Sequence, residues 1–460
     1  VIGYQAAVSA GNQSGSVSIG YRAARYPQGN YNTAIGMQAL QGNSSVTSAY
    51  NNTAVGYQAG HDITSGYRNT LVGFQAGYDI ESGLDNTLIG QQAGANITTG
   101  PRNTIVGSYA GDALTTVDGV VAIGYAALGA GAGSSYDVAI GYQAHNNGTG
   151  RGVFIGLQAG AATTGGGVHI GSEAGETNTV GSLTLIGSEA GKMVSGTATG
   201  MTAIGHGVST NASGTYHTMV GFQAGNTLKG NVNTGIGYKV LRSGTNATHQ
   251  NNIAIGYQTM QGGDYSVTNQ DNVAIGINAM RYASGSSYNV AVGQTLFATD
   301  QTSTQVVSIG YRALSGTTST TGTTAIGHLA GRDLTVGDFN TVIGKSAMLQ
   351  NTQGEENTII GYDAGYNVQS ASSLQGSFNT FLGFRAAYNY VGGVDYGSNV
   401  AIGHQTLLTG TNANRTVAVG NAAGVSGTAS TDNVLVGYGA GSYANSTGNT
   451  MIGNKAGFRT

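Results

Sequence analysis

The chain has 460 residues, no cysteine and a formal net charge of −3, and only 8% of its residues are charged. The absence of cysteine excludes disulfides and thiolate metal sites, and the absence of any basic run excludes an electrostatic groove for nucleic acid. No apolar stretch approaches the roughly 20 residues of a membrane span. We therefore expect neither nucleic-acid binding nor membrane insertion in this segment.

One nine-residue string, NTAVGYQAG at 52–60, returns in variants along the whole chain. Aligned on the glycine after the aliphatic residue, the sequence holds 27 copies with a mean spacing of about 17 residues. Self-similarity at a short, fixed period is typical of a solenoid, which grows by stacking. We predict that residues 1–460 form a single continuous repeat array. Because the numbering opens and closes within a repeat, we expect a fragment of a longer fibre protein.

The three residues before each repeat glycine predict a short β-strand. The residue directly before the glycine is Ile, Val or Leu, and the residue two positions earlier is Thr, Val or Ile. Such β-branched residues favour strands, and alternate residues of a strand face the same side. We predict that this side is the core. The early repeat positions of this kind, with their glycines, are Ile35, Gly36, Val55, Gly56, Val72, Gly73, Ile89 and Gly90.

The residue between these two positions is also apolar. It is Leu71, Leu88 and Ile105 in three consecutive copies, and Ala is the commonest residue in the other copies. Apolar residues on both faces predict a strand that is buried on both sides. Because a thin solenoid buries only its inner face, we expect the second wall to be another copy of the chain.

The segment after the glycine predicts a tight turn and a narrow interior. The third residue is usually Ala, as at Ala59 and Ala76, and we expect a second strand to pass there. The glycine itself is expected to turn the chain in a conformation that residues with a Cβ avoid. Seven residues past the glycine, Ile63 and Ile80 predict a third inward position.

An asparagine opens the strand in 15 copies. Stacked in register, Asn side chains can form hydrogen-bonded columns and can satisfy the backbone of turns. We expect Asn52, Asn69 and Asn86 to do both. Longer intervals, such as the 22 residues from Gly361 to Gly383, are expected to place insertions in loops and to leave the strands intact.

These patterns define the predicted fold class. It is all-β, a parallel β-roll or β-helix solenoid of about 27 coils with a repeat near 17 residues. The period of 3.6 that marks helices is absent, so almost no helix is expected.

The strings NTAVGYQAG, NTLVGFQAG, NTLIGQQAG and NTIIGYDAG resemble the shaft repeats of phage tail-fibre proteins, which usually precede a C-terminal intramolecular chaperone domain. The shorter core NVAIG, at 272–276 and 399–403, is also similar to the head repeats of trimeric autotransporter adhesins, whose repeat is shorter. Either resemblance implies a homotrimeric fibre. The first implies a virion tail fibre with other fibre or tail proteins at the missing ends, and the second implies a bacterial outer surface.

No catalytic, cofactor or metal constellation is evident. Aromatic residues follow the repeat glycine in many copies and predict either a packing column at a subunit boundary or a strip that contacts a host surface glycan; they include Tyr57, Phe74, Tyr142 and Tyr257. The histidines, among them His61, His145 and His169, show no ligand spacing, so no metal is expected. Glu173 and Glu189 stand in equivalent positions one coil apart. Glycosidases use carboxylate pairs, but no acidic cleft accompanies these two residues, and we interpret them as solvated or bridged.

Three functions of different class follow. The first is a structural and adhesive fibre, above all the shaft of a viral tail fibre that presents a receptor-binding tip, with a bacterial surface adhesin as the alternative. The second is a polysaccharide-degrading β-helix, and we expect no enzyme because no coil gathers the necessary Asp, Glu and Arg. The third is an ice-binding solenoid, which needs an unbroken row of exposed Thr, whereas Thr here shares its position with Val.

Overall fold

The computed structural model describes residues 1–8, 14–26, 29–42, 48–131, 133–178, 181–196, 198–242, 248–262, 268–297, 302–368, 376–390, 397–409, 413–426, 431–443 and 445–458. The chain divides into two compact units, Val1–Asn226 and Thr227–Thr460, and each is described by itself. Both units are parallel β-solenoids, and none of the described residues is helical.

In the first unit, one short strand precedes each repeat glycine, and an isolated bridge at Ile2 stands before Gly3. The strands are β1 (Val17–Ile19), β2 (Thr33–Ile35), β3 (Thr53–Val55), β4 (Thr70–Val72), β5 (Thr87–Ile89), β6 (Thr104–Val106), β7 (Val121–Ile123), β8 (Val138–Ile140), β9 (Gly152–Ile155), β10 (Gly167–Ile170), β11 (Leu183–Ile186), β12 (Thr202–Ile204) and β13 (Thr218–Val220).

The second unit repeats this arrangement and adds two strands, β14 and β16, that pair with each other away from the main sheet. Its strands are β14 (Lys229–Asn231), β15 (Thr234–Tyr238), β16 (Thr248–Gln250), β17 (Ile253–Tyr257), β18 (Val273–Ile277), β19 (Val290–Gln294), β20 (Val307–Tyr311), β21 (Thr324–Ile326), β22 (Thr341–Ile343), β23 (Thr358–Ile360), β24 (Thr380–Leu382), β25 (Val400–Ile402), β26 (Val417–Val419), β27 (Val434–Val436) and β28 (Thr450–Ile452).

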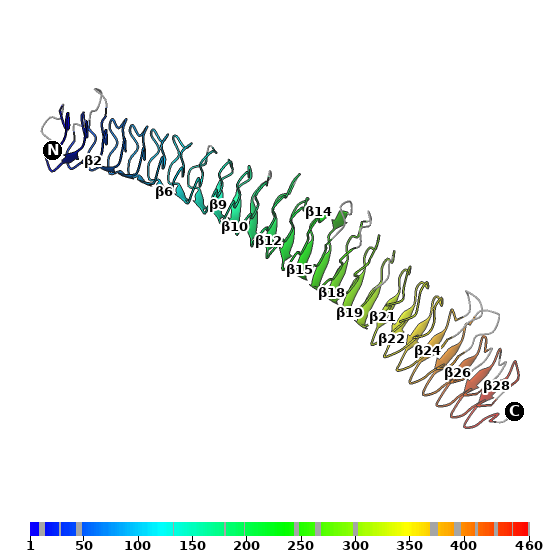
Figure 1. The fold of residues 1–460 in the computed structure, drawn as a ribbon. Coiled ribbons are helices and arrows are strands. Elements are labelled where there is room, and N and C mark those ends of the chain that lie inside the picture. Colours follow the sequence, from blue (N-terminus) through cyan, green and yellow to red (C-terminus); the bar gives the residue numbers. More distant parts are fainter. Residues whose placement is uncertain are drawn as a thin grey trace. The chain divides into compact units, whose positions relative to one another are not determined.

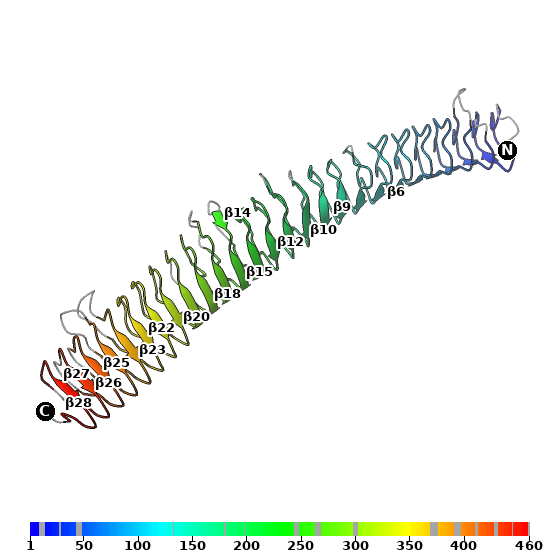
Figure 2. The same ribbon diagram turned by 180° about the vertical axis from the view of Figure 1, so that it is seen from behind.

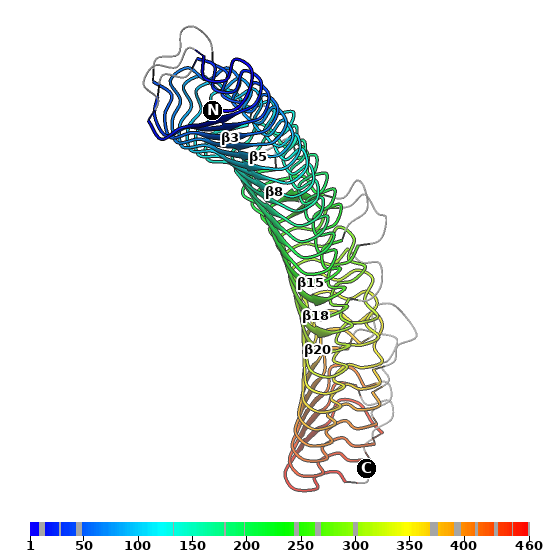
Figure 3. The same ribbon diagram turned by 60° about the vertical axis from the view of Figure 1, so that its left-hand side comes forward.

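Within each unit, every main-sheet strand pairs in parallel with the strand one coil later, and equivalent residues of the repeat face each other. Val55 pairs with Val72, and Val72 pairs with Ile89. Figures 1 and 2 show the strands of each unit from opposite sides, and Figure 3 shows β3, β5 and β8 stacked along one wall of the coils. The predicted solenoid and its repeat are therefore confirmed.

The two faces of the strand are the reverse of the prediction. The middle residue points into the coil, where Ala54, Leu71 and Leu88 are fully buried. The flanking residues point outward, and in β3 to β5 they are only partly buried or exposed. Ile35, Val55, Val72 and Ile89 thus lie outside the core of the single chain. Successive residues of a strand point to opposite faces, so with Leu71 and Leu88 inside, beside Gly77, the flanking residues point outward.

The other inward positions agree with the sequence. Ala59 and Ala76, three residues past the glycine, and Ile63 and Ile80, seven past it, are all fully buried. Ala59, Ile63 and Ile80 belong, with the middle residues of the strands, to one apolar cluster that extends from Ala23 to Ala144. Each coil is therefore closed by three inward columns of side chains, one from the strand and two from the segment that follows it.

The repeat glycine turns the chain as predicted. Gly56 has a φ of +144°, and a Cβ placed on it would lie 2.2 Å from the carbonyl oxygen of Gly73. The predicted second strand at Ala59 is wrong, since Gln58 and Gly60 have φ values of +53° and +61°. Residues in the left-handed region cannot continue an extended strand. Among the described copies, the main strand reaches at most one residue past the glycine.

The predicted asparagine column is present. Asn52, Asn69 and Asn86 are buried, and each later side chain accepts and donates hydrogen bonds within the column. The Asn69 Nδ2 atom also donates to the carbonyl oxygen of Gly83, 2.9 Å away, at the turn that closes the coil. The side chains therefore satisfy both their neighbours and the turn backbone, which a buried polar group requires.

An insertion leaves the strand register unchanged. Across the 22-residue interval from Gly361 to Gly383, Ile360 of β23 still pairs with Leu382 of β24. The interval's extra residues include 369–375, which lie outside the described residues.

Candidate functional site

The outward side of each strand forms a surface that we call the outer face. It consists of the strand residues one and three positions before the repeat glycine and of the residue directly after it. In β3 to β5, the rows are Thr53, Thr70 and Thr87 on one side and Val55, Val72 and Ile89 on the other. Adjacent strands lie about 4.8 Å apart, so each row is a close-packed line of β-branched side chains.

The outer face is apolar, exposed and almost uncharged. Ile89 and Ile123 are each 37% exposed, and Ile236 is 40% exposed. Along the whole sequence, the three positions of the outer face hold no Asp, Glu or Arg and a single Lys, Lys345. Contiguous exposed apolar surface on a soluble chain marks an interaction site, and depletion of charge is typical of the centre of a protein interface.

Aromatic rings on the outer face stack from one coil to the next. The ring centroids of Tyr57 and Phe74 are 5.1 Å apart and nearly parallel. Tyr142 stacks on Tyr125 at 5.2 Å, and Tyr257 stacks on Tyr238 at 5.0 Å. Because the rings cover each other's faces, they present mainly edges to solvent, whereas a sugar platform needs an open ring face. The geometry therefore favours the packing column over the glycan strip among these aromatics.

The residue two positions after the repeat glycine forms a second column, which was not predicted from the sequence. The side-chain amides of Gln38, Gln58, Gln75 and Gln92 are hydrogen-bonded in series, at 3.0, 2.9 and 3.2 Å. All four residues are in the left-handed region. The recurring Gln in the YQAG string was the available signal, because only a stacked turn places identical amides at hydrogen-bonding distance in successive coils.

Two well-defined ion pairs lie on the turns and not on the outer face. Arg68 donates two hydrogen bonds to Asp85, at 2.5 and 2.7 Å, and Arg415 does the same to Asp432, at 2.6 and 3.0 Å. The bonds from Arg68 lower the pKa of Asp85. Exposed ion pairs of this kind contribute little to stability, but they match one coil to the next.

The two glutamates singled out in the sequence form no acid pair. Lys192 binds Glu173 and also lies 3.5 Å from the carboxylate of Glu176. The hydrogen bond to Glu173 raises the pKa of Lys192, which stays charged and holds the carboxylates. The interpretation of Glu173 as a bridged residue is confirmed.

The first unit contains a buried polar cluster inside its coils. The side chains of Asp137 and His145 are fully buried, with Nε2 of His145 4.0 Å from Oδ2 of Asp137. His145 stacks on Phe154 at 3.7 Å, and Phe154 meets His169 edge to face. Burial lowers the pKa of His145 and of His169 to about 4 and raises the pKa of Asp137. The cluster holds neutral imidazoles in an interior without access for a substrate.

Within the described ranges, no group of three or more His, Asp and Glu side chains is placed to hold a metal ion. The same residues form no helix long and apolar enough to cross a membrane. No family model matches the chain, and comparisons with curated proteins and with solved structures find no similar protein.

Proposed function

We propose that this chain is the shaft of a structural and adhesive fibre, built from several copies of itself around their outer faces. Three copies, as in a viral tail fibre that holds a receptor-binding tip away from the particle, fit the sequence resemblance best. The same construction would serve a bacterial surface adhesin. We favour the viral fibre because its repeats resemble the longer NTAVGYQAG string, whereas the adhesin repeat is shorter.

The observation that carries the proposal is the outer face itself. The inner face of the strands needs no partner chain, because Ala54 and Leu71 are already buried within their own chain. The outward rows through Val55 and Ile89 remain exposed in the single chain, although they hold only apolar or β-branched residues. Burying apolar surface gains about 25 cal/mol per Å², and a row that recurs in every coil multiplies this gain along the fibre.

The arrangement also gives a physical reason for uniform assembly. A charge at one coil of the interface would have to be matched in each copy, since an unpaired buried charge costs several kcal/mol. The ion pairs Arg68 with Asp85 and Arg415 with Asp432 stay within one chain and away from the outer face. Other fibre or tail proteins are then expected at the ends of the array, and host-surface molecules at its tip.

Multi-angle light scattering after gel filtration tests the proposal. At micromolar concentration, we expect the mass of three copies of the 46.2 kDa chain. The double variant Val72→Asp with Ile89→Asp places charges on the outer face and should give a monomer with an unchanged β-type circular dichroism spectrum. Asn96→Asp, on an exposed turn, is the control and should assemble normally. A monomeric wild-type chain, or an assembled double variant, would contradict the proposal.

A further inference from the structure

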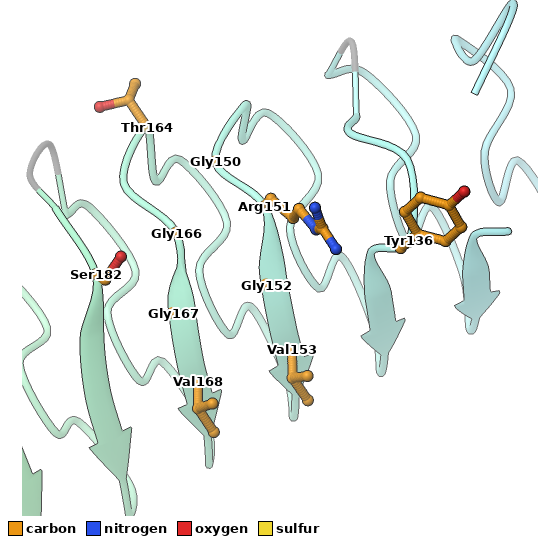
Figure 4. A pocket seen from close by; sticks show the side chains of 10 residues that line it. All are labelled: Tyr136, Gly150, Arg151, Gly152, Val153, Thr164, Gly166, Gly167, Val168 and Ser182. Carbon is orange, nitrogen blue, oxygen red and sulfur yellow. The ribbon is translucent and has the colours of Figure 1, made fainter. Parts of the chain in front are cut away.

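The first unit carries an open depression of about 730 Å³ beside the starts of β9 and β10 (Figure 4). Its size is within the range of pockets that hold small ligands. The floor consists of glycines, which leave the backbone accessible, and Val153 and Val168 form an apolar edge. Tyr136, Thr164 and Ser182 contribute three hydroxyl groups, and Arg151 is the one charged residue of the lining.

One column of side chains has an unusual sequence beside the depression. The column consists of the residue five positions before each repeat glycine, and where this residue is glycine, an aromatic ring of the next coil usually covers it. Tyr136 covers Gly119 and Tyr216 covers Gly200, so that a Cβ on either glycine would lie 2.8 or 2.7 Å from the ring. Gly166 occupies the same column, but the residue one coil later is Ser182. No ring follows Gly166 in this column, and a Cβ on Gly166 would lie 2.3 Å from the backbone carbonyl oxygen of Arg151.

Arg151 supplies an unmatched positive charge at this opening. Its guanidinium lies over the Tyr136 ring, 5.3 Å from the centroid, and no carboxylate of the described residues lies within 4.0 Å of it. The two carboxylates nearest to the lining are already engaged. Asp118 is bound by Arg102, and Asp137 points inward and accepts hydrogen bonds from the backbone N–H groups of Gly152 and Ser134.

We infer that this depression binds an acidic saccharide, with a hexuronate carboxylate on Arg151. The guanidinium is suited to paired hydrogen bonds with a carboxylate. The hydroxyls of Thr164 and Ser182 match sugar hydroxyls, the valines match the C–H face of the ring, and the glycine floor permits close approach. The site differs from the stacked aromatics, and all of its residues come from one chain, but its edge residues Val153 and Val168 also belong to the outer face.

Ligand-observed NMR and calorimetry on the full chain test this inference, with digalacturonic acid as the probe and its dimethyl ester as the uncharged match. Wild-type protein should bind the acid about tenfold more tightly than the ester, because the ester removes the charge-assisted hydrogen bonds. Arg151→Gln should weaken binding of the acid about tenfold and leave binding of the ester unchanged. Arg312→Gln, which removes an exposed arginine of the second unit, is the control and should bind both probes like the wild type.

A filling variant separates the pocket from a general charge effect. Ser182→Tyr places beside the depression the kind of side chain that follows glycine elsewhere in the column, as Tyr216 follows Gly200. It should abolish binding of both probes while circular dichroism is unchanged. Equal binding of acid and ester, wild-type affinity in either pocket variant, or no binding of the acid would each overturn the inference. Light scattering on the same samples reports assembly separately, so a failure of the fibre proposal is distinguishable.

Discussion

The backbone N–H and the Nδ2 atom of Asn69 both donate hydrogen bonds to Oδ1 of Asn52, at 3.0 and 3.1 Å. Its own Oδ1 accepts from the backbone N–H and Nδ2 of Asn86, one coil later. One side chain thus links three coils. Since these atoms are buried, each bond has no water to replace it.

Replacing Asn69 with Ala should therefore destabilise the fold by about 2–3 kcal/mol, because buried partners on Asn86, Asn52 and Gly83 lose their bonds. Chemical denaturation followed by circular dichroism measures the loss. Asn96→Ala, on an exposed turn of the neighbouring coil, is the control and should stay within about 0.5 kcal/mol of wild type. Equal stabilities of the two variants would show that the column contributes nothing.

The orientation of the strand makes a second prediction, on two adjacent residues of β4. Leu71 is fully buried and Thr70 is partly exposed on the opposite face. Leu71→Ala should cost about 2–5 kcal/mol by leaving a cavity, whereas Thr70→Ala should cost less than about 1 kcal/mol. Denaturation curves of both variants decide the matter. The reverse order of stabilities would mean that the inward and outward assignments are exchanged.

The repeat glycines make a third prediction. In Gly73→Ala, the new Cβ would lie 2.3 Å from the carbonyl oxygen of Gly90 at a φ of +140°, so we expect a loss above about 4 kcal/mol or no folded protein. Gly196 is a matched control, because it has a φ of +80° but no atom within 4 Å of a Cβ. Gly196→Ala should cost only the left-handed conformation, about 1–2 kcal/mol. Similar expression and melting of the two variants would contradict the close approach of the coils.

The fourth prediction concerns pH. The folded chain protonates His169 only near pH 4, because its imidazole is buried, whereas the unfolded chain protonates it near pH 6.5. The unfolded state thus binds more protons between these values, so stability should fall as pH falls from 6.5 toward 4, by up to about 3 kcal/mol for each such histidine. The raised pKa of Asp137 opposes part of this loss.

The variant His169→Leu tests the assignment, since Leu185 occupies the equivalent position one coil later. Both ring nitrogens of His169 have no hydrogen-bond partner among the described residues, so the replacement should preserve the fold. Its melting temperature should depend less on pH between 6.5 and 4 than that of wild type. Identical pH profiles would show that His169 does not titrate in this range.

Much of the fold follows from the sequence, because a repeat states each structural requirement many times. The strand before Gly56, the turn at that glycine and the inward Asn52 and Ala59 are each recognisable from residue type alone. Residue type alone does not show which face of the strand points inward. Residue type favours the aliphatic Val55 as the core residue, but the inward column is the one that holds Ala54 and Leu71.

The unpredicted features depend on contacts between coils, which residue types do not encode. The recurrence of Gln in the YQAG string, as at Gln58, did not by itself reveal that the side chain would stack in a left-handed turn on Gln38. The depression at Arg151 is lined by residues of successive coils, which become neighbours only when the coils stack. Apolar residues on both sides of the strand predicted a second apolar face outside the core. The structure has such a face, but it is formed by the flanking residues of the strand and not by the middle residue.

The separation of contacting residues along the sequence affects how the chain folds and how it can lengthen. Strand pairing and the asparagine bonds join residues 14 to 22 positions apart, whatever the position in the array. The mean sequence separation of contacts is therefore independent of chain length, so a longer array pays no added loop-closure entropy and need not fold more slowly. Folding can start at any coil and spread to its neighbours. A gene can lengthen by duplicating a coil without inventing a new contact, which makes length the easiest property of this protein for selection to change.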